Sequence, residues 1–224
     1  MVMVKIRVDR FIQSRRKTIG LEVTSGGELV VRAPYSVNRN LLQDFLNKKA
    51  GWIMKKKALA KKRTDINRDL DLETSNKVLF LGKYFPVKIH RGKRVFFDQG
   101  FFVPETDAAG KKKAVTGWLK KEARKYLNFR VERLAGRLGI DYGRIRITSA
   151  KKRWGSCSGG SNLNFTYRLI MAPAEVIDYV IIHELMHIRQ QNHSKKFWKE
   201  VAQAIPDYKK YQRWLKDNGY RLVV

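Results

Sequence analysis

The sequence is poor in cysteine, in acidic residues and in long apolar runs. Its single cysteine, Cys157, excludes an intramolecular disulfide and suits a reducing compartment such as the cytosol. No apolar run is long enough to cross a bilayer, and the first residues lack the apolar core of a signal peptide. These absences predict a soluble, cytoplasmic protein with no membrane partner.

The scarcity of acidic residues leaves a large positive charge. The chain has 48 lysines and arginines against 20 aspartates and glutamates, a formal net charge of +28. The densest basic run lies between Lys48 and Arg63, with no acidic residue inside it. Such a field concentrates polyanions, so nucleic acid is a candidate partner. Since no recognised binding motif accompanies the charge, a solvated lysine-rich surface is an equally open interpretation.

The strongest indication of chemistry is the sequence His183-Glu-Leu-Met-His187. Two histidines at positions i and i+4 lie on one face of a helix and can bind one metal ion, with Glu184 in reach of a water on that ion. His193 is a candidate third ligand, which would leave a fourth position open for water. Six residues of unbroken helix rotate by about 240°, so the helix must end before His193 if all three histidines face one ion.

The flanking residues supply such a break. Asn192 tolerates the left-handed conformation in which helices often end, and Ser194 is a good N-cap for a following helix at 195–204. Pro173 suits the first turn of the motif helix. This helix is apolar on nearly every side, so we expect it to be buried. Its histidines then need polar partners or a metal to offset their desolvation.

The pattern predicts a zinc-dependent hydrolase. His183, His187 and His193 would bind Zn²⁺ as neutral imidazoles, and the metal would lower the pKa of a bound water. Glu184 would act as the general base that accepts a proton from this water and then passes a proton to the leaving group. Arg168 and Tyr179 are candidates for contact with the substrate or the transition state.

Two other residues, Cys157 and His90, could in principle take part in chemistry, but we interpret both as structural. Cys157 could be a nucleophile in principle, but no separate Cys/His pairing is visible, so we interpret it as a small buried or turn residue. His90 has no neighbour at ligand spacing, and we expect it in a strand or at the surface.

The first half of the chain predicts strands and one helix. Strands are expected at 4–8, 19–23 and 29–33, the last two joined by a turn at Gly26-Gly27. A helix should begin after Ser36 or Asn38 and extend to about Lys62, with Trp52 in its buried stripe. Later elements follow the same rules: a polar connector at 64–75, a hairpin at 78–81 and 84–90, and a strand within 94–103.

The second half predicts a long helix and a hairpin before the motif helix. The helix should span 115–138 after a small, polar and basic stretch at 107–113, and Gly139 should end it. Strands follow at 144–148 and 163–169, separated by a turn-rich passage that includes Gly155. We expect an α+β fold with an organisational boundary between residues 106 and 107. Residues 1–106 would form a strand-rich region with one long helix, and residues 107–224 the catalytic region, as parts of one continuous domain.

Several segments around the motif occur together and in a fixed order. They are Arg153–Ser158, Asn164, Tyr167–Leu169, Ala172-Pro173, Tyr179, His183–His187, Asn192–Ser194 and Phe197-Trp198. This series resembles the YgjP-like metallopeptidase domain family. The resemblance implies a zincin-like catalytic domain, with zinc held by His183, His187 and His193, Glu184 as general base, and a strand along the cleft that can pair with an extended substrate.

Three functions stay open on this basis. The first is a zinc-dependent hydrolase, specifically a metallopeptidase that acts on peptides or proteins. The second is a nucleic-acid-associated basic protein that acts on or near proteins bound to DNA or RNA. The third is a metal-dependent nucleotide pyrophosphatase, an activity that some members of the family are described to have, although this chain lacks a glycine-rich phosphate loop.

Overall fold

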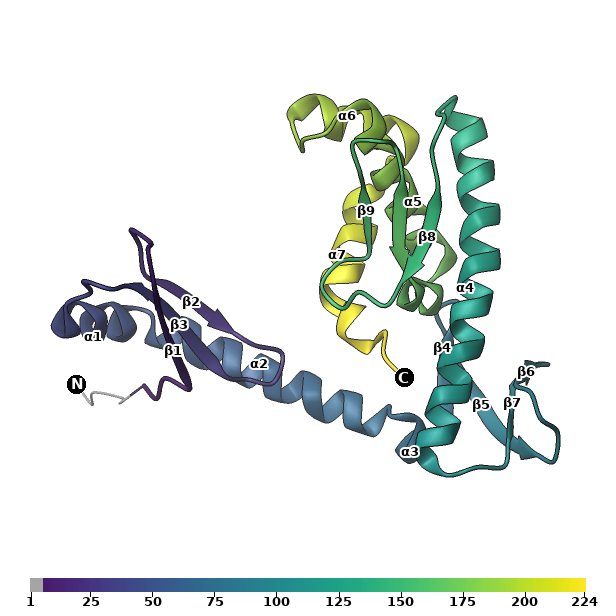
Figure 1. Ribbon diagram of the computed structural model, residues 1–224, viewed down its shortest axis with the longest axis horizontal. Coiled ribbons are helices and arrows are strands. Elements are labelled where there is room, and N and C mark those ends of the chain that lie inside the picture. The colour runs from purple at the N-terminus through teal and green to yellow at the C-terminus, as the bar shows by residue number, and fades with distance from the viewer. Residues whose placement is uncertain (1–5) are drawn as a thin grey trace. The chain divides into compact units, whose positions relative to one another are not determined.

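The computed structural model describes residues 6–224, and the chain forms two compact units, residues 1–69 and 70–224. Unit 1 runs from purple to blue and unit 2 from blue-green to yellow in Figure 1. The division differs from the expected boundary between residues 106 and 107, because the strands before residue 106 share a core with the helix after it. No helix formed by residues 6–224 is long and apolar enough to span a membrane.

Unit 1 combines a three-stranded sheet with two helices. Its elements are β1 (Arg10–Ser14), β2 (Gly20–Val23), β3 (Leu29–Pro34), α1 (Arg39–Lys48) and α2 (Ala50–Asp69). Strand β3 lies in the centre, antiparallel to β2 and parallel to β1. The expected hairpin of β2 and β3 is confirmed, with Gly27 at a φ of 85° in its turn. Buried Leu29, Val31, Leu46 and Ile53 form the small core of this unit.

The first strand of unit 1 lies later in the chain than predicted. Val4 and Lys5, the start of the strand expected at 4–8, lie outside the described residues, and residues 6–8 form no strand. The strand begins after Asp9, because Asp9 forms two hydrogen bonds with Leu29. Its N–H donates to the Leu29 carbonyl at 3.0 Å, and its carboxylate accepts the Leu29 N–H at 2.7 Å. These two bonds fix the register of β1 against β3.

The single helix expected up to Lys62 is two helices. Asn38 caps α1 as predicted, with its side chain accepting the Asn40 N–H at 2.8 Å, but the helix breaks at Lys49. The connector expected at 64–75 is wrong, because α2 continues through it to Asp69 and a short helix, α3 (Leu72–Ser75), follows. Trp52 is 41% exposed rather than buried, because the next residue faces the core instead.

Unit 2 carries most of the secondary structure. After α3 come β4 (Lys77–Phe80), β5 (Lys83–His90), β6 (Phe96–Phe97), β7 (Phe101–Pro104), α4 (Ala108–Leu138), β8 (Ile145–Thr148), β9 (Gly155–Cys157), β10 (Leu163–Thr166), α5 (Ala174–Arg189), α6 (Lys195–Ala204) and α7 (Tyr208–Asn218). One sheet has the strand order β4-β5-β7-β6 and the other the order β8-β10-β9. The α+β fold class is thus confirmed.

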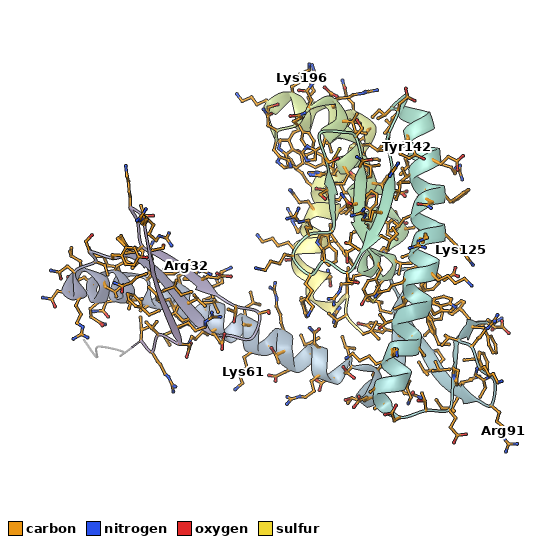
Figure 2. The ribbon with its side chains drawn as sticks, in the orientation of Figure 1. Arg32, Lys61, Arg91, Lys125, Tyr142 and Lys196 are labelled. Carbon is orange, nitrogen blue, oxygen red and sulfur yellow. The ribbon has the colours of Figure 1, made fainter. Side chains whose placement is uncertain are left out.

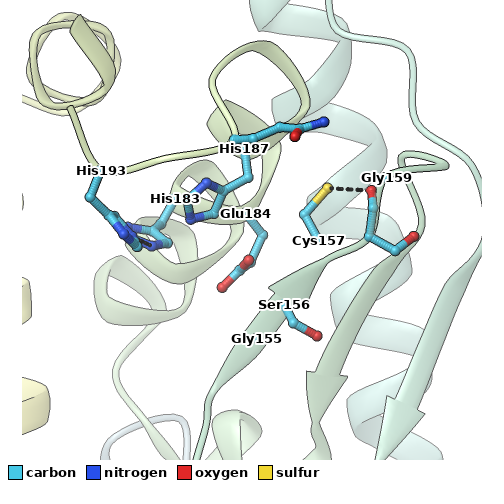
Figure 3. Close-up of a pocket in the computed structure, with 10 residues that line it drawn as sticks. Gly155, Ser156, Cys157, Gly159, His183, Glu184, His187 and His193 are labelled. Carbon is cyan, nitrogen blue, oxygen red and sulfur yellow. Dashed lines mark hydrogen bonds between the residues drawn. The ribbon is translucent and has the colours of Figure 1, made fainter.

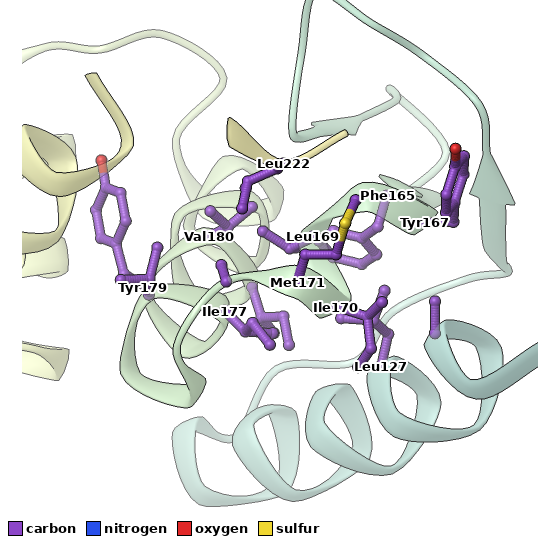
Figure 4. Packing of buried hydrophobic residues seen from close by; sticks show 14 of the residues in the cluster. Leu127, Phe165, Tyr167, Leu169, Ile170, Met171, Ile177, Tyr179, Val180 and Leu222 are labelled. Atoms are coloured by element: carbon purple, nitrogen blue, oxygen red, sulfur yellow. The ribbon is translucent and has the colours of Figure 1, made fainter. Parts of the chain in front are cut away.

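The long helix α4 forms one wall of the core of unit 2. Its apolar stripe is buried, and Gly139 ends it as predicted, in a left-handed conformation at a φ of 60°. The helix begins earlier than the predicted residue 115, because the Asp107 carboxylate caps it by accepting the Gly110 N–H at 2.8 Å. Figure 4 shows Leu127 of α4 in the cluster that also contains Phe165 and Ile170.

The segment before α5 contains fewer strand residues than predicted. The hairpin expected from the strands at 144–148 and 163–169 is wrong, because β8 and β10 pair in parallel. Strand β10 instead pairs antiparallel with β9, with Phe165 opposite Gly155. The strand expected at 163–169 ends at Thr166, and a 3₁₀ helix, Tyr167–Met171, leads to Pro173 and α5. The turn-rich passage expected around Gly155 includes the short strand β9, which forms one edge of its sheet within the described residues.

Candidate metal centre

Helix α5 carries the motif through the interior of unit 2. It begins after Pro173, and its buried side chains occur on all sides of the helix, as expected for an apolar helix. Arg130 of α4 holds it from one side by donating two hydrogen bonds to Asp178, one of them at 2.8 Å. The histidines and Glu184 are therefore held by a fixed helix in a largely apolar surrounding.

The three predicted histidines meet at the end of this helix (Figure 3). Ring centroids lie 4.9 Å apart for His183 and His187, 5.0 Å for His183 and His193, and 4.7 Å for His187 and His193. One ligand nitrogen of each ring lies within 4.8 Å of the other two. Such a cluster has the geometry and the donor type of a three-histidine metal site.

The helix break that brings His193 back is made at a different residue than predicted. Gln190, at φ −134° and ψ 102°, leaves the helix in an extended conformation, and Asn192 is not left-handed. The Asn192 side chain instead accepts the Ser194 N–H at 3.2 Å. Ser194 caps α6 as predicted, since its hydroxyl accepts the Phe197 N–H at 3.4 Å. The break and restart thus use one extended residue and two side-chain caps.

The extended Gln190 also orients a ligand. Its carbonyl lies 3.1 Å from Nδ1 of His187, so the ring donates its Nδ1–H there and keeps the Nε2 lone pair for a metal. His183 and His193 face each other through their Nε2 atoms at 3.1 Å. No sequence signal could have predicted the role of Gln190, because a backbone carbonyl is available at every position.

The charge state and the burial of His183 and His187 suit the binding of a cation. Burial lowers the pKa of His183 to about 4, with the charges of His187 and His193 acting in the same direction, and burial also lowers the pKa of His187. Both rings are thus neutral near pH 7, the form that binds metal. Nδ1 of His183 is buried without a hydrogen-bond partner among the described residues. A cation bound at the other ring nitrogen, Nε2, would offset part of the desolvation of this ring.

Glu184 lies between the histidines and strand β9, and it is only 6% exposed. Its carboxylate accepts the backbone N–H of Cys157. Burial raises the pKa of Glu184 to about 7, while the Cys157 N–H and the charge of Arg153 act in the opposite direction. A carboxyl group with a pKa near neutrality can both take up and release a proton at physiological pH.

Gly155 makes room for this carboxylate. A β-carbon at this position would lie 2.6 Å from Cγ and 2.7 Å from Oε1 of Glu184, closer than any side chain could tolerate. The sequence placed Gly155 only in a turn-rich passage and did not predict its contact with Glu184. No local signal could have found it, because the two residues are far apart in sequence and meet only when β9 packs on α5.

A cavity of about 440 Å³ opens in front of these groups. It is lined by the three histidines, Glu184, Gln191 and residues 155–159. A second cavity of about 230 Å³ shares Gly155, His183 and Glu184 with the first. Its other walls are Trp154, Tyr179, Val180, Gln212 and Leu215. The buried carboxylate therefore borders a wide polar cavity and a smaller, mainly apolar one.

A family comparison agrees with this geometry. The model of the YgjP-like metallopeptidase domain matches residues 17–218. The chain belongs to this family. The expectation of a metal-dependent hydrolase is thereby confirmed at the level of the family, and the match extends across both compact units. A search of curated proteins gave no significant match.

Two solved structures are similar to part of this YgjP-like protein. They are the metallopeptidase zymogens abylysin of Pyrococcus abyssi and jannalysin of Methanocaldococcus jannaschii. Abylysin has 23% identity and a TM-score of 0.37, over 41% of this chain and 93% of that one. Jannalysin has 21% identity and a TM-score of 0.37, over 41% of this chain and 94% of that one.

The remaining predicted residues lie at different distances from the YgjP-like site. Tyr179 is buried one turn before His183, with ring centroids 6.0 Å apart, and burial raises its pKa to about 12. Arg168 stacks over the ring of Tyr167 at 5.8 Å and lines neither cavity. Cys157 lines the larger cavity, and burial together with Glu184 raises the pKa of its thiol, which keeps it protonated.

Proposed function

We propose that the protein is a zinc-dependent peptidase in which Glu184 is the general base. One observation carries this proposal. A single carboxylate with a pKa near 7 lies beside three clustered imidazoles, at the floor of a cavity that reaches solvent. Membership in a metallopeptidase family supports peptides or proteins as the substrate class.

The histidines are the proposed ligands, and zinc is the proposed metal. Three imidazole nitrogens in a compact cluster suit Zn²⁺, which takes nitrogen ligands and tolerates an open fourth position. When bound, zinc would supply a Lewis acid that polarises a substrate carbonyl and makes water more acidic. The hydrogen bond from His187 to the Gln190 carbonyl keeps one ligand in the binding tautomer before metal arrives.

Glu184 is the proposed carrier of the proton between the attacking water and the leaving group. It would accept a proton from the attacking water and deliver it to the leaving amine, and a pKa of about 7 balances the two directions. The Cys157 N–H holds one side of the carboxylate, and Gly155 leaves the space that the group needs. These contacts keep the group fixed without neutralising it.

Strand β9 is the proposed docking edge for the substrate. It is an edge strand among the described residues, and Gly155, Ser156 and Cys157 line the cavity in front of the histidines. An extended peptide can add to such an edge through main-chain hydrogen bonds. This arrangement would place a peptide bond opposite Glu184.

The proposal is tested by metal content and peptide hydrolysis of matched variants. Glu184→Gln should keep about one zinc per chain and lose hydrolysis by roughly 10²- to 10⁴-fold, because the base is removed and the ligands stay. Glu175→Gln, on the exposed first turn of the same helix, should leave both unchanged. His187→Ala should lose the metal. Wild-type hydrolysis rates in the Glu184→Gln variant would show that the assigned base is wrong.

A further inference from the structure

A third cavity, separate from the two that border Glu184, lies between α4 and the loop that joins β5 to β6. Its volume is about 510 Å³, and it shares no lining residue with the metal centre. Four basic side chains line it: Lys93 and Arg94 from the loop, and Lys121 and Lys125 from α4. We call this cavity the basic groove. Its volume falls in the range of binding sites for small molecules or for single nucleotides of a longer strand.

The charge of the basic groove is largely uncompensated. Glu122 is the one acidic residue in its lining, and its carboxylate is paired with Lys125 at 2.9 Å. Within residues 6–224, neither Lys93, Arg94 nor Lys121 is paired with an acid. All three are exposed at the rim. An anionic ligand would therefore meet three free positive charges from two separate segments.

The loop that carries Lys93 and Arg94 is held in place by His90. The Gly92 N–H donates to Nδ1 of His90 at 3.0 Å, so the proton of this ring is on Nε2, which donates to the Arg94 carbonyl at 3.1 Å. The ring also packs edge-on against Phe96, with centroids 5.1 Å apart. A β-carbon at Gly92 would lie 2.4 Å from this ring, so only glycine fits. The two basic residues thus extend from a fixed loop.

The floor of the groove is apolar and also fixed. Val95, Pro104, Ala114 and Trp118 are half-buried there. The Trp118 ring is held edge-on against Phe101, with centroids 4.9 Å apart. Gly117 leaves the helix surface open, since a β-carbon there would meet nothing within 4 Å. A flat apolar group can therefore lie on this floor.

We propose that the basic groove binds a single strand of nucleic acid, a function separate from the proposed peptidase activity. Phosphates would pair with the basic rim, and an unpaired base would lie on the apolar floor. A duplex keeps its bases stacked and offers only its backbone, so the floor favours a single strand. Arg124 and Lys113 are exposed on the same helix and extend the positive charge along α4, where Lys125 can be seen in Figure 2.

The test measures binding of a labelled oligothymidylate of about 20 nucleotides by fluorescence anisotropy, across a salt series. The groove variant Arg94→Gln/Lys121→Gln is compared with Lys61→Gln/Lys62→Gln on α2. Both variants remove two exposed basic side chains and the same charge. The groove variant should bind on the order of 20-fold more weakly at about 0.1 M salt, and its salt slope should fall by about 1.4, because each lost phosphate contact removes about 0.7. The α2 variant should bind within about twofold of the wild type.

Several outcomes would overturn the proposal. Equal weakening in both variants would show that overall charge, not the groove, attracts the strand. Equal affinity for a duplex of the same sequence would show that the floor takes no base. Binding of polyglutamate as tightly as the oligothymidylate would identify an acidic protein as the better partner, and displacement by inorganic triphosphate at equal concentration would identify a small-anion site. Absence of binding by the wild type at about 0.1 M salt would also overturn it.

Discussion

The close approach of Gly155 to Glu184 leaves room for the proposed base that no larger residue would leave. Gly155→Ala would place a β-carbon 2.6 to 2.9 Å from three atoms of Glu184 and push the carboxylate aside. We expect peptide hydrolysis to fall by roughly 10²-fold, since a misplacement of about 1 Å has this effect on positioned groups. Zinc content should be unchanged, because the three atoms nearest to such a β-carbon all belong to Glu184 and none to a histidine.

Gly159 provides the matched control for this prediction. It lines the same cavity, but a β-carbon there would meet nothing within 4 Å. Gly159→Ala should therefore hydrolyse peptides at close to the wild-type rate. Equal losses in the two variants, measured as kcat/KM, would mean that the clash with Glu184 is not what matters at this edge.

Glu184 and His183 also respond to pH with opposite signs in the metal-free protein. Burial raises the pKa of Glu184 from 4.5 to about 7 and lowers the pKa of His183 from 6.5 to about 4. As pH falls from 7 to 5, the folded state takes up the Glu184 proton, which adds stability. Over the same interval the unfolded state takes up the His183 proton, which removes stability. The two effects nearly cancel in the wild type.

Removal of Glu184 leaves the histidine effect alone. Between about pH 7 and about pH 5, metal-free Glu184→Gln should lose about 2 kcal/mol more of its free energy of unfolding than the wild type does. Urea unfolding of both proteins after treatment with a chelator measures this difference. Parallel stability curves across this interval would rule out a buried, protonated Glu184 in the metal-free protein.

At the scale of elements, the smaller cavity is lined by residues of α5, α7 and the start of β9. Its size and lining predict which substrate side chains the protein prefers. Its volume of about 230 Å³ exceeds the roughly 150 Å³ that accommodates a benzene ring in an apolar cavity. Its walls include Val180, Leu215 and the ring of Trp154, and it borders Glu184. The cavity thus suits a large apolar or aromatic side chain next to the cleaved bond.

Leu215 on α7 allows this preference to be tested. Leu215→Trp should fill the cavity and lower kcat/KM for peptides with phenylalanine beside the cleaved bond by roughly tenfold or more, with little effect on peptides that have alanine there. Leu215→Ala enlarges the cavity and should keep the preference for phenylalanine. If Leu215→Trp slowed both peptides equally, the cavity would have no part in side-chain selection.

At the scale of the whole molecule, unit 2 contains both the candidate metal centre and the larger core. The buried cluster around α4 and α5 draws all its buried members from residues 72–222, and the three histidines lie in the same unit. The basic groove also belongs to this unit. Unit 1 has its own small core of four buried residues.

A fragment of residues 70–224 should therefore fold and bind one zinc ion by itself. Because the metal binds the folded state, zinc at about 100 times its dissociation constant should add about 2.7 kcal/mol of stability. Thermal unfolding with zinc and with a chelator measures this gain, with the full chain as reference. A fragment that unfolds at the same temperature in both conditions would contradict the assignment of the site to unit 2.

Local sequence patterns were sufficient to predict several helices and turns and the three histidines of the site. The spacing of His183, His187 and His193, the cap at Ser194 and the stop at Gly139 each depend on residues close together in the chain, as do the hairpin turns. A helix or a turn is determined largely by the residues that form it, so these predictions needed no knowledge of packing.

Only the tertiary structure decided which surfaces meet. Gly155 opposes Glu184, Trp52 is exposed while Ile53 is buried, and the units divide after Asp69. Each of these facts depends on contacts between residues far apart in the chain, and a hydrophobic pattern read along one helix cannot distinguish the face that finds a partner from the face that does not. The sequence by itself predicted the three histidines that meet at the site, and packing determined the space around them.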